Sequence, residues 1–167
     1  VGSYSLDANT TGGQNVAVGK NALTANTTAS NNTAVGDRAL ESNTTGTTNT
    51  SVGGVSLKSN TTGDNNTACG YYALNANTTG ARNVAIGAEA LDASVGINDN
   101  VAIGYQAQTS NTGNGATANT GASNIAIGSY ALKSLNSTSS GDSIQNVAIG
   151  VEAVSYTHLR AHETIDD

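Results

Sequence analysis

The sequence predicts an all-β fold, a parallel β-solenoid or β-roll of about eight 17-residue rungs over residues 1–153. The first observation is a repeated phrase that opens with an asparagine every 17 residues, at Asn15, Asn32, Asn49, Asn66, Asn83 and Asn100. The second is composition: 20 Gly, no Pro, 11% charged residues and few large apolar side chains. Stacked repeats can still give such a chain a thin continuous core. Gly, Asn and Thr recur in every repeat, which disfavours helix.

Each repeat divides into two short apolar segments and two turns. In the first full copy, Val16–Val18 is short, apolar and followed by glycine, which predicts a strand of three or four residues. Gly19 begins a tight turn that contains the two most variable positions of the repeat. Ala22 and Leu23 are expected to begin a second short strand. The phrase Asn26–Thr28 turns the chain back, because Asn and Thr side chains bond the local backbone.

One column of the repeat is apolar in every copy, and we predict that it faces the core. It contains Val18, Val35, Val52, Cys69, Ile86, Ile103, Ile127 and Ile149. Cys69 is therefore expected to be a buried hydrophobic residue. The neighbouring Ala17 column holds only Ala or Ser and is expected to face outward, where another surface approaches closely. Since Ala22 and Leu23 are consecutive, one of them should also face away from its coil, which predicts self-association of identical chains.

Equivalent asparagines are expected to stack as ladders, with side-chain amides bonded from rung to rung. Two later copies, from Asn124 and Asn146, follow longer spacings of 24 and 22 residues. These insertions predict longer loops near 109–121 and 133–145, at an edge where repeat proteins often carry recognition. The chain begins inside a repeat, so we expect it to be truncated at its N-terminus.

The repeated phrases resemble those of known fibrous proteins. The phrase N-x-A-[V/I]-G-x-x-A, as in NVAVGKNA at 15–22 and NVAIGAEA at 83–90, resembles the head repeats of trimeric autotransporter adhesins of the YadA-head type. The longer form with ALESNTTG at 39–46 resembles repeats of phage and bacterial tail-fibre-like proteins. The resemblance covers about residues 1–153. It implies a left-handed β-roll, a homotrimer, and a place outside the cell, on the cell surface as an outer-membrane adhesin or in a virion tail fibre.

The last residues, 154–167, depart from the repeat. The run 154–164 matches one translation frame of a common transposase-type sequencing adapter, so we expect a non-native tail that is left out of fold reasoning. A genuine short C-terminal cap is the alternative. His158 and His162 have the spacing of a metal-binding pair, but the Glu of the zinc-helix motif is missing, and no metal site is expected.

Four tyrosines fall on the two variable positions after the repeat glycine: Tyr71, Tyr72, Tyr105 and Tyr130. They should be displayed along one edge of the rod, where aromatic rings can stack on sugars or pack on protein. Tolerated surface aromatics are the alternative. The Asn-Thr-Thr phrases match N-glycosylation acceptors, and they also supply threonine rows of the kind that an ice-binding solenoid presents.

No catalytic constellation or phosphate loop is present, so an enzyme is not predicted and no cofactor is expected. The net charge of −6 and the six basic residues disfavour nucleic-acid binding, and the sequence holds no membrane segment. The predicted function is a structural or adhesive fibre segment, the shaft or head of a surface adhesin or tail fibre. Such a segment would space and display elements that bind a host-surface glycan or protein. The alternative is a solenoid that itself binds glycans or ice.

Overall fold

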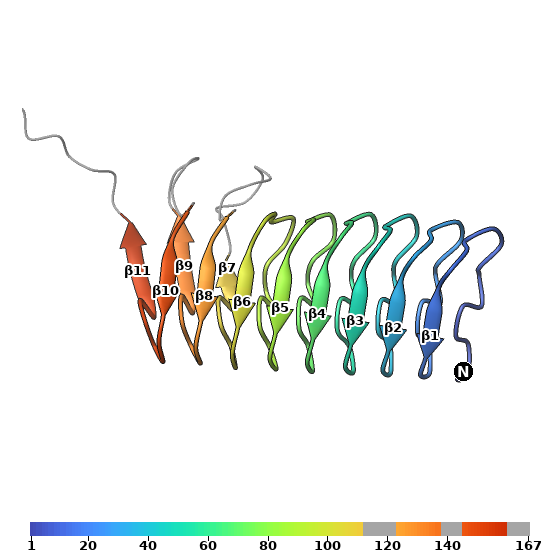
Figure 1. Ribbon diagram of the computed structural model, residues 1–167, viewed down its shortest axis with the longest axis horizontal. Helices are drawn as coiled ribbons and strands as arrows, with labels where there is room; N and C mark the ends of the chain where they lie inside the picture. Colours follow the sequence, from blue (N-terminus) through green and yellow to red (C-terminus); the bar gives the residue numbers. More distant parts are fainter. Residues whose placement is uncertain (112–122, 138–144, 160–167) are drawn as a thin grey trace, which may run out of the picture.

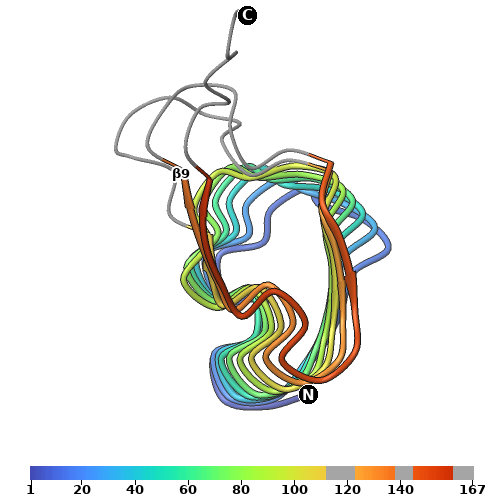
Figure 2. The same ribbon diagram turned by 90° about the vertical axis from the view of Figure 1, so that its left-hand side faces the viewer.

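The computed structural model describes residues 1–111, 123–137 and 145–159 of the chain. The predicted parallel β-solenoid is confirmed: successive turns of the coil stack along a straight rod, and from Val16 on each contributes one short strand to the main sheet (Figure 1). Strands β1 (Val16–Val18) and β2 (Thr33–Val35) pair with Val16 opposite Thr33, one 17-residue turn apart. Seen from the end, the rungs superpose in a single closed outline (Figure 2).

The described residues form two parallel sheets. The main sheet has eight strands in the order β1-β2-β3-β4-β5-β6-β8-β10. After β1 and β2 its strands are β3 (Thr50–Val52), β4 (Thr67–Cys69), β5 (Val84–Ile86), β6 (Val101–Ile103), β8 (Ile125–Ile127) and β10 (Val147–Ile149). The smaller sheet, in the order β11-β9-β7, consists of β7 (Ser110–Asn111), β9 (Ser134–Ser137) and β11 (Tyr156–Leu159). Equivalent positions of the repeat are therefore stacked in columns.

The glycine after each main strand is required by the close stacking of rungs. Gly19 has a φ of 134°, a conformation that side chains disfavour. A Cβ on Gly19 would lie 2.3 Å from the carbonyl oxygen of Gly36 on the next rung. Any larger residue would push two rungs apart, so this position is glycine in every copy.

The segment at Ala22 is a turn, and the predicted second strand there is wrong. Both Ala22 and Leu23 are fully buried, so neither side chain faces away from the coil. Leu23 has a φ of 52°, and this left-handed backbone breaks the alternation that would send consecutive side chains to opposite faces. The conformation costs about 1–2 kcal/mol, which burial of a leucine, worth about 1.5–3 kcal/mol, offsets. The Leu23 N–H also donates to Ala39 O on the next rung at 3.1 Å.

The predicted inward column is wrong, because its side chains point out of the coil. Val18, Val52 and Ile86 are 42%, 39% and 40% exposed, and Cys69 is exposed rather than buried. The other members are half-buried or exposed: Val35, Ile103, Ile127 and Ile149. The strand's middle position faces inward instead, and all of its residues are buried: Ala17, Ala34, Ser51, Ala68, Ala85, Ala102, Ala126 and Ala148.

Lack of space inside the narrow coil accounts for this reversal. In a three-residue strand the first and third side chains share one face and the middle side chain takes the other. The interior already holds a second alanine column and a leucine column from the turn, such as Ala39 and Leu40. Small residues on the strand leave room for the leucines, since protein cores are close-packed. The small-residue column is therefore part of the core and is not an interface.

Polar substitutions inside the core are paired locally. In the third rung Ser51 and Ser56 replace the two alanines, and Ser51 Oγ donates to Ser56 O at 2.9 Å. Gln108 stands where other rungs have leucine and is fully buried. Its Nε2 donates to Asn100 Oδ1 at 3.0 Å. These two substitutions are thus accommodated by hydrogen bonds inside the coil, although Gln108 Oε1 and the buried Ser94 hydroxyl have no hydrogen-bond partner among the described residues.

The predicted asparagine ladders are confirmed, and there are two. In the strand ladder, Asn49 Oδ1 accepts the Asn66 N–H at 2.9 Å, and Asn49 Nδ2 donates to Gly63 O at 2.8 Å. The equivalent Oδ1-to-backbone bond links each rung from Asn15 to Asn146. In the turn ladder, Nδ2-to-Oδ1 bonds run through Asn9, Asn26, Asn43, Asn60 and Asn77. The ladders satisfy buried backbone groups in the turns, which a sheet alone would leave unpaired.

The expected long loops, near 109–121 and 133–145, lie largely outside the described residues. Strands β7 and β9 lie at their starts. Of the predicted non-native tail, Tyr156–Leu159 forms β11, which pairs in parallel with β9. His162 and the rest of the tail from residue 160 lie outside the described residues.

Candidate binding surfaces

The main sheet presents an outer face made of the first and third side chains of each strand. The first column contains Val16, Thr33, Thr50, Thr67, Val84, Val101, Ile125 and Val147. The second column is the set predicted to be the core, from Val18 to Ile149. Because the strands pair in register, both columns run straight along the rod. The outer face is thus a regular surface, β-branched at every position except Cys69, that the chain does not cover with its own described residues.

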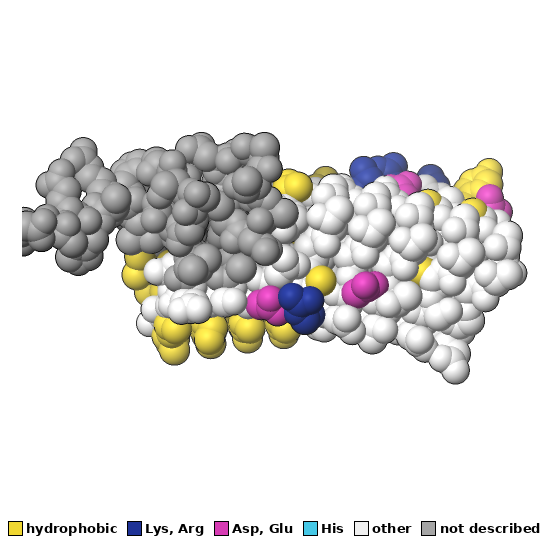
Figure 3. All heavy atoms as spheres, turned by 90° about the horizontal axis from the view of Figure 1, so that it is seen from above, with side chains coloured by type: hydrophobic (Ala, Val, Ile, Leu, Met, Phe, Trp, Pro, Cys, Tyr) yellow, Lys and Arg dark blue, Asp and Glu magenta, His cyan; other side chains and the backbone are white. Residues whose placement is uncertain are grey.

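The outer face becomes more apolar toward the C-terminal end. Strands β2 to β4 carry threonine in the first column, whereas β1 and the main-sheet strands β5, β6, β8 and β10 carry two aliphatic side chains each. At the last rung Val147 is 63% and Ile149 is 69% exposed. Figure 3 shows a row of hydrophobic side chains along one flank toward the C-terminal end. A contiguous apolar strip of this kind makes the outer face a candidate interaction surface.

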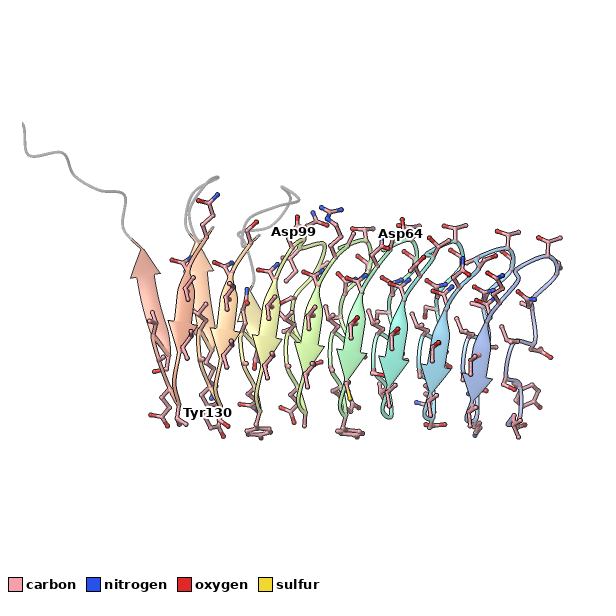
Figure 4. The ribbon with its side chains drawn as sticks, in the orientation of Figure 1. Asp64, Asp99 and Tyr130 are labelled. Atoms are coloured by element: carbon pink, nitrogen blue, oxygen red, sulfur yellow. The ribbon has the colours of Figure 1, made fainter. Side chains whose placement is uncertain are left out.

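The four predicted tyrosines lie on the turn edge that follows the main strands, as expected from their positions. Tyr130 lies on the opposite edge of the rod from Asp64 and Asp99 (Figure 4). The tyrosines form two pairs with edge-to-face rings: Tyr71 with Tyr72, centroids 4.4 Å apart, and Tyr105 with Tyr130, 5.3 Å apart. Tyr71 and Tyr105 are 56% and 42% exposed, while their partners are half-buried. We call these four residues the tyrosine edge.

Polar side chains lie between and beside the tyrosine pairs. Gln106 Nε2 donates to Glu89 Oε2 at 2.6 Å and contacts the Tyr105 hydroxyl at 3.3 Å. The Glu89 carboxylate is the main cause that raises the pKa of Tyr105. The ammonium of Lys133 lies 4.6 Å from the Tyr130 ring centroid. These contacts combine aromatic faces with hydrogen-bond donors and acceptors.

An open hollow of about 350 Å³ continues the tyrosine edge toward the C-terminal end. Its lining residues are Tyr130, Lys133, Glu152 and Ser155. Its size falls at the lower end of that of small-molecule sites. The repeat position of Tyr72 and Tyr130 is occupied on other rungs by Glu89, Gln106 and Glu152. The repeat pattern alone therefore predicts that these polar residues lie on the same edge. Sequence reasoning missed them because it followed only the aromatic residues.

The opposite edge is tied to the fold by hydrogen bonds. Asp64 Oδ1 accepts bonds from the Thr47 N–H and hydroxyl at 2.6 and 2.9 Å. The Arg82 guanidinium bonds both oxygens of Asp99, at 2.6 and 2.9 Å, and holds the pKa of that carboxyl below its usual value. These charged groups reinforce turns between adjacent rungs.

The Asn-Thr-Thr phrases serve the fold as well. Their asparagines Asn26, Asn43, Asn60 and Asn77 are fully buried, so a glycan cannot be attached there without opening the ladder. The first threonine of a phrase also bonds the next rung: Thr44 and Thr61 hydroxyls donate to backbone carbonyls at 3.0 Å. The second threonine, such as Thr45, is exposed. These exposed threonines form the row on which the ice-binding alternative depends.

Within the described ranges no group of three His, Cys, Asp or Glu side chains could hold a metal ion. Those same residues include no helix that is long and apolar enough to cross a membrane. Comparisons with protein-family models, curated proteins and solved structures find no match for this chain. The outer face and the tyrosine edge are therefore the two surfaces from which a function is argued.

Proposed function

We propose that this chain is a structural segment of an extracellular fibre, the shaft or head of a surface adhesin or of a virion tail fibre. The observation that carries this proposal is the outer face, a straight, uncharged and mostly β-branched strip on a rod whose rungs repeat without interruption from β1 to β6. Its role is to set distance and to display binding elements, and no chemical reaction is assigned to it.

The outer face favours association of identical chains. Fully burying a valine or isoleucine that is exposed to water is worth about 1.5–3 kcal/mol. The third-position residues Val52, Ile86 and Ile149 retain about 40–70% of their exposure, so covering each yields about 1 kcal/mol. Because the strip repeats from rung to rung, these contributions to the free energy of association add up along its length. Another copy of this chain offers a matching strip with the same rung spacing.

We propose a homotrimer, in which three outer faces meet along a common axis. The resemblance of the repeat phrases to trimeric adhesin heads favours three copies. The low charge of the strip supports close packing: no Asp, Glu, Lys or Arg occurs at either outer column of the main sheet. The turn edges, including the tyrosine edge, would remain at the surface of such an assembly.

Sedimentation equilibrium of the chain and of an outer-face variant tests this proposal. The double substitution Ile103→Lys and Ile127→Lys places two charges in the strip while leaving the alanine and leucine core intact. The chain should sediment as a trimer of 16.5 kDa subunits and the variant as a folded monomer. The matched control Thr45→Lys adds a charge on an exposed turn and should remain trimeric. A chain that is monomeric at micromolar concentration would refute the proposal.

The spacer role has its own test. Deletion of residues 33–66 removes two whole repeats and joins Asn32 to Thr67 in phase. Because rungs are about 4.8 Å apart, the rod should shorten by about 10 Å in small-angle scattering and still associate. Loss of folding, or an unchanged length, would contradict a modular spacer.

A further inference from the structure

The tyrosine edge has a regular composition that neither the core nor the outer face requires. On successive rungs its two turn positions carry Tyr71 and Tyr72, then Ala88 and Glu89, then Tyr105 and Gln106. The next rungs carry Ser129 and Tyr130, then Val151 and Glu152. The three preceding rungs carry no aromatic residue at either position, and their pairs include Lys20–Asn21, Asp37–Arg38 and Gly54–Val55. Apart from Tyr4 in the first turn, the aromatic residues at these positions are thus gathered on the C-terminal half of one edge.

The backbone holds these side chains at fixed spacing. The Glu89 N–H donates to Tyr71 O at 2.8 Å, and the Tyr130 N–H donates to Tyr105 O at 2.9 Å. Tyr72, Glu89 and Tyr130 each have φ between 57° and 60°, so all three take the same turn conformation. Since each rung advances by about 4.8 Å, the rings of Tyr71 and Tyr130 are displayed about three rungs apart along the rod. The edge is a preformed surface, which limits the entropy lost on binding.

The polar groups on this edge specify the kind of ligand. Gln106, Lys133 and the tyrosine hydroxyls offer donors, while Glu89 and Glu152 offer acceptors. A ligand with many hydroxyl groups, each a donor and an acceptor, satisfies both kinds. The exposed ring of Tyr105, at 42%, supplies a flat apolar face for the C–H side of a sugar ring. A cationic ligand would use only the acceptors, and the ammonium of Lys133 in the hollow would repel it.

Charge then decides between neutral and acidic sugars. Glu89 is bonded to Gln106, and Glu152 lines the hollow beside Lys133. On the rungs from Tyr71 to Glu152, Lys133 is the only cationic side chain that the described residues place on this edge, and its ammonium already lies over the Tyr130 ring. Two carboxylates against one engaged lysine disfavour an anionic ligand, as does the net charge of −6.

We propose that the tyrosine edge, with Glu89, Gln106 and the hollow at Lys133 and Glu152, is a binding site for a neutral oligosaccharide that lies along the rod. The site spans the rungs from Tyr71 to Glu152. It does not depend on the self-association proposed above, since the outer face is made of strand residues and this edge of turn residues. In an assembly of several chains, repeated copies of a weak site would act together.

The direct test is titration with neutral trisaccharides of glucose, galactose, mannose and N-acetylglucosamine. The chain contains six Tyr and no Trp, and four of the six belong to the tyrosine edge, so a change in intrinsic tyrosine fluorescence on binding comes largely from this edge. At least one neutral trisaccharide should bind in the millimolar range. Sialyllactose, choline and a proline-rich peptide are titrated in parallel. Stronger binding of any of these three than of every neutral sugar would overturn the proposed ligand class.

Variants locate the site. The double substitution Tyr105→Ala and Tyr130→Ala should weaken sugar binding by about tenfold or more, because aromatic anchors dominate such contacts. The matched control Tyr4→Ala removes a tyrosine that is 62% exposed at the same turn position, far along the rod, and should leave affinity unchanged. Glu89→Gln should weaken neutral-sugar binding a few-fold. Unchanged affinity in the double variant, with circular dichroism showing an intact fold, would place the site elsewhere and overturn the proposal.

Discussion

The N-terminal and C-terminal halves of the rod share one interior but have different exteriors. Ala34 and Leu40 in the second rung are fully buried, as are Ala85 and Leu91 in the fifth. On the outer face, the first strand position changes from threonine in β2, β3 and β4 to valine or isoleucine from β5 onward. The interior therefore determines the coil, and the exterior is free to acquire other roles. Both candidate surfaces are strongest in the C-terminal half.

The largest expected effect is the loss of stability when a core leucine is removed, and it should be the same in both halves. Leu40→Ala and Leu91→Ala each empty a fully buried site, and each should lower the free energy of unfolding by about 2–5 kcal/mol. Urea denaturation followed by circular dichroism measures this. A clearly smaller loss in one half would show that the two interiors are not equivalent.

The ladder should also be equally important along the rod. Asn49→Ala and Asn83→Ala each remove an acceptor for a buried N–H of the next rung, at 2.9 and 3.1 Å. Each should cost about 1–3 kcal/mol, since an unpaired buried group keeps its desolvation penalty. Thermal melting of both variants beside the exposed control Thr45→Ala checks this. Losses no greater than that of the control would mean that the ladder does not stabilise the stack.

Much of the coil could be predicted from the repeat, and the facing of its strands could not. The 17-residue period gave the stacked register, and the aligned asparagines gave the ladders. The positive φ of Leu23 has no signal in residue type, because leucine disfavours that conformation. Without it, Ala22 and Leu23 could not both be placed inside. Once both are inside, the small Ala17 column must face them, and the Val18 column must face out.

The candidate surfaces could likewise be predicted only in part from the sequence. The position of the tyrosines on one edge followed from the repeat alone, since turn positions recur in phase. Their pairing with Glu89, Gln106 and Lys133 depends on side-chain contacts between rungs, which periodicity does not describe. The outer face escaped sequence reasoning because β-branched apolar residues usually indicate a core.

Exchanging outer-face residues between the two halves should have an effect of intermediate size, on self-association rather than on folding. Val101→Thr gives the sixth rung the exterior of the third, and Thr67→Val does the reverse. The first should weaken association and the second should strengthen it, each by about fivefold per side chain buried, since one partly exposed aliphatic side chain contributes about 1 kcal/mol. The monomer's unfolding should change by less than about 0.5 kcal/mol. Dilution series in sedimentation velocity report the association, and equal effects on folding would contradict an outward position.

The smallest effect concerns a half-buried carboxyl in the fifth rung. Burial is the main cause that raises the pKa of Asp92, and its repeat equivalent one rung earlier is Asn75. Because the folded pKa exceeds the unfolded one, the penalty is absent below the unfolded pKa and appears as pH rises through the folded pKa. Asp92→Asn should therefore raise Tm slightly at pH 7, with the difference shrinking toward pH 3. A difference that is independent of pH would exclude this cause.

Cys69 tests the central claim most directly, because it is the only cysteine of the chain and lies on the outer face. The measurement is the rate of its reaction with a maleimide over a dilution series. An outward-facing, self-associating strip predicts slow reaction in the concentrated trimer and fast reaction once dilution separates the chains. Fast reaction at every concentration would show an outer face without a partner. Slow reaction in the folded monomer would show that Cys69 and the rest of the Val18 column are buried, which would contradict their outward position.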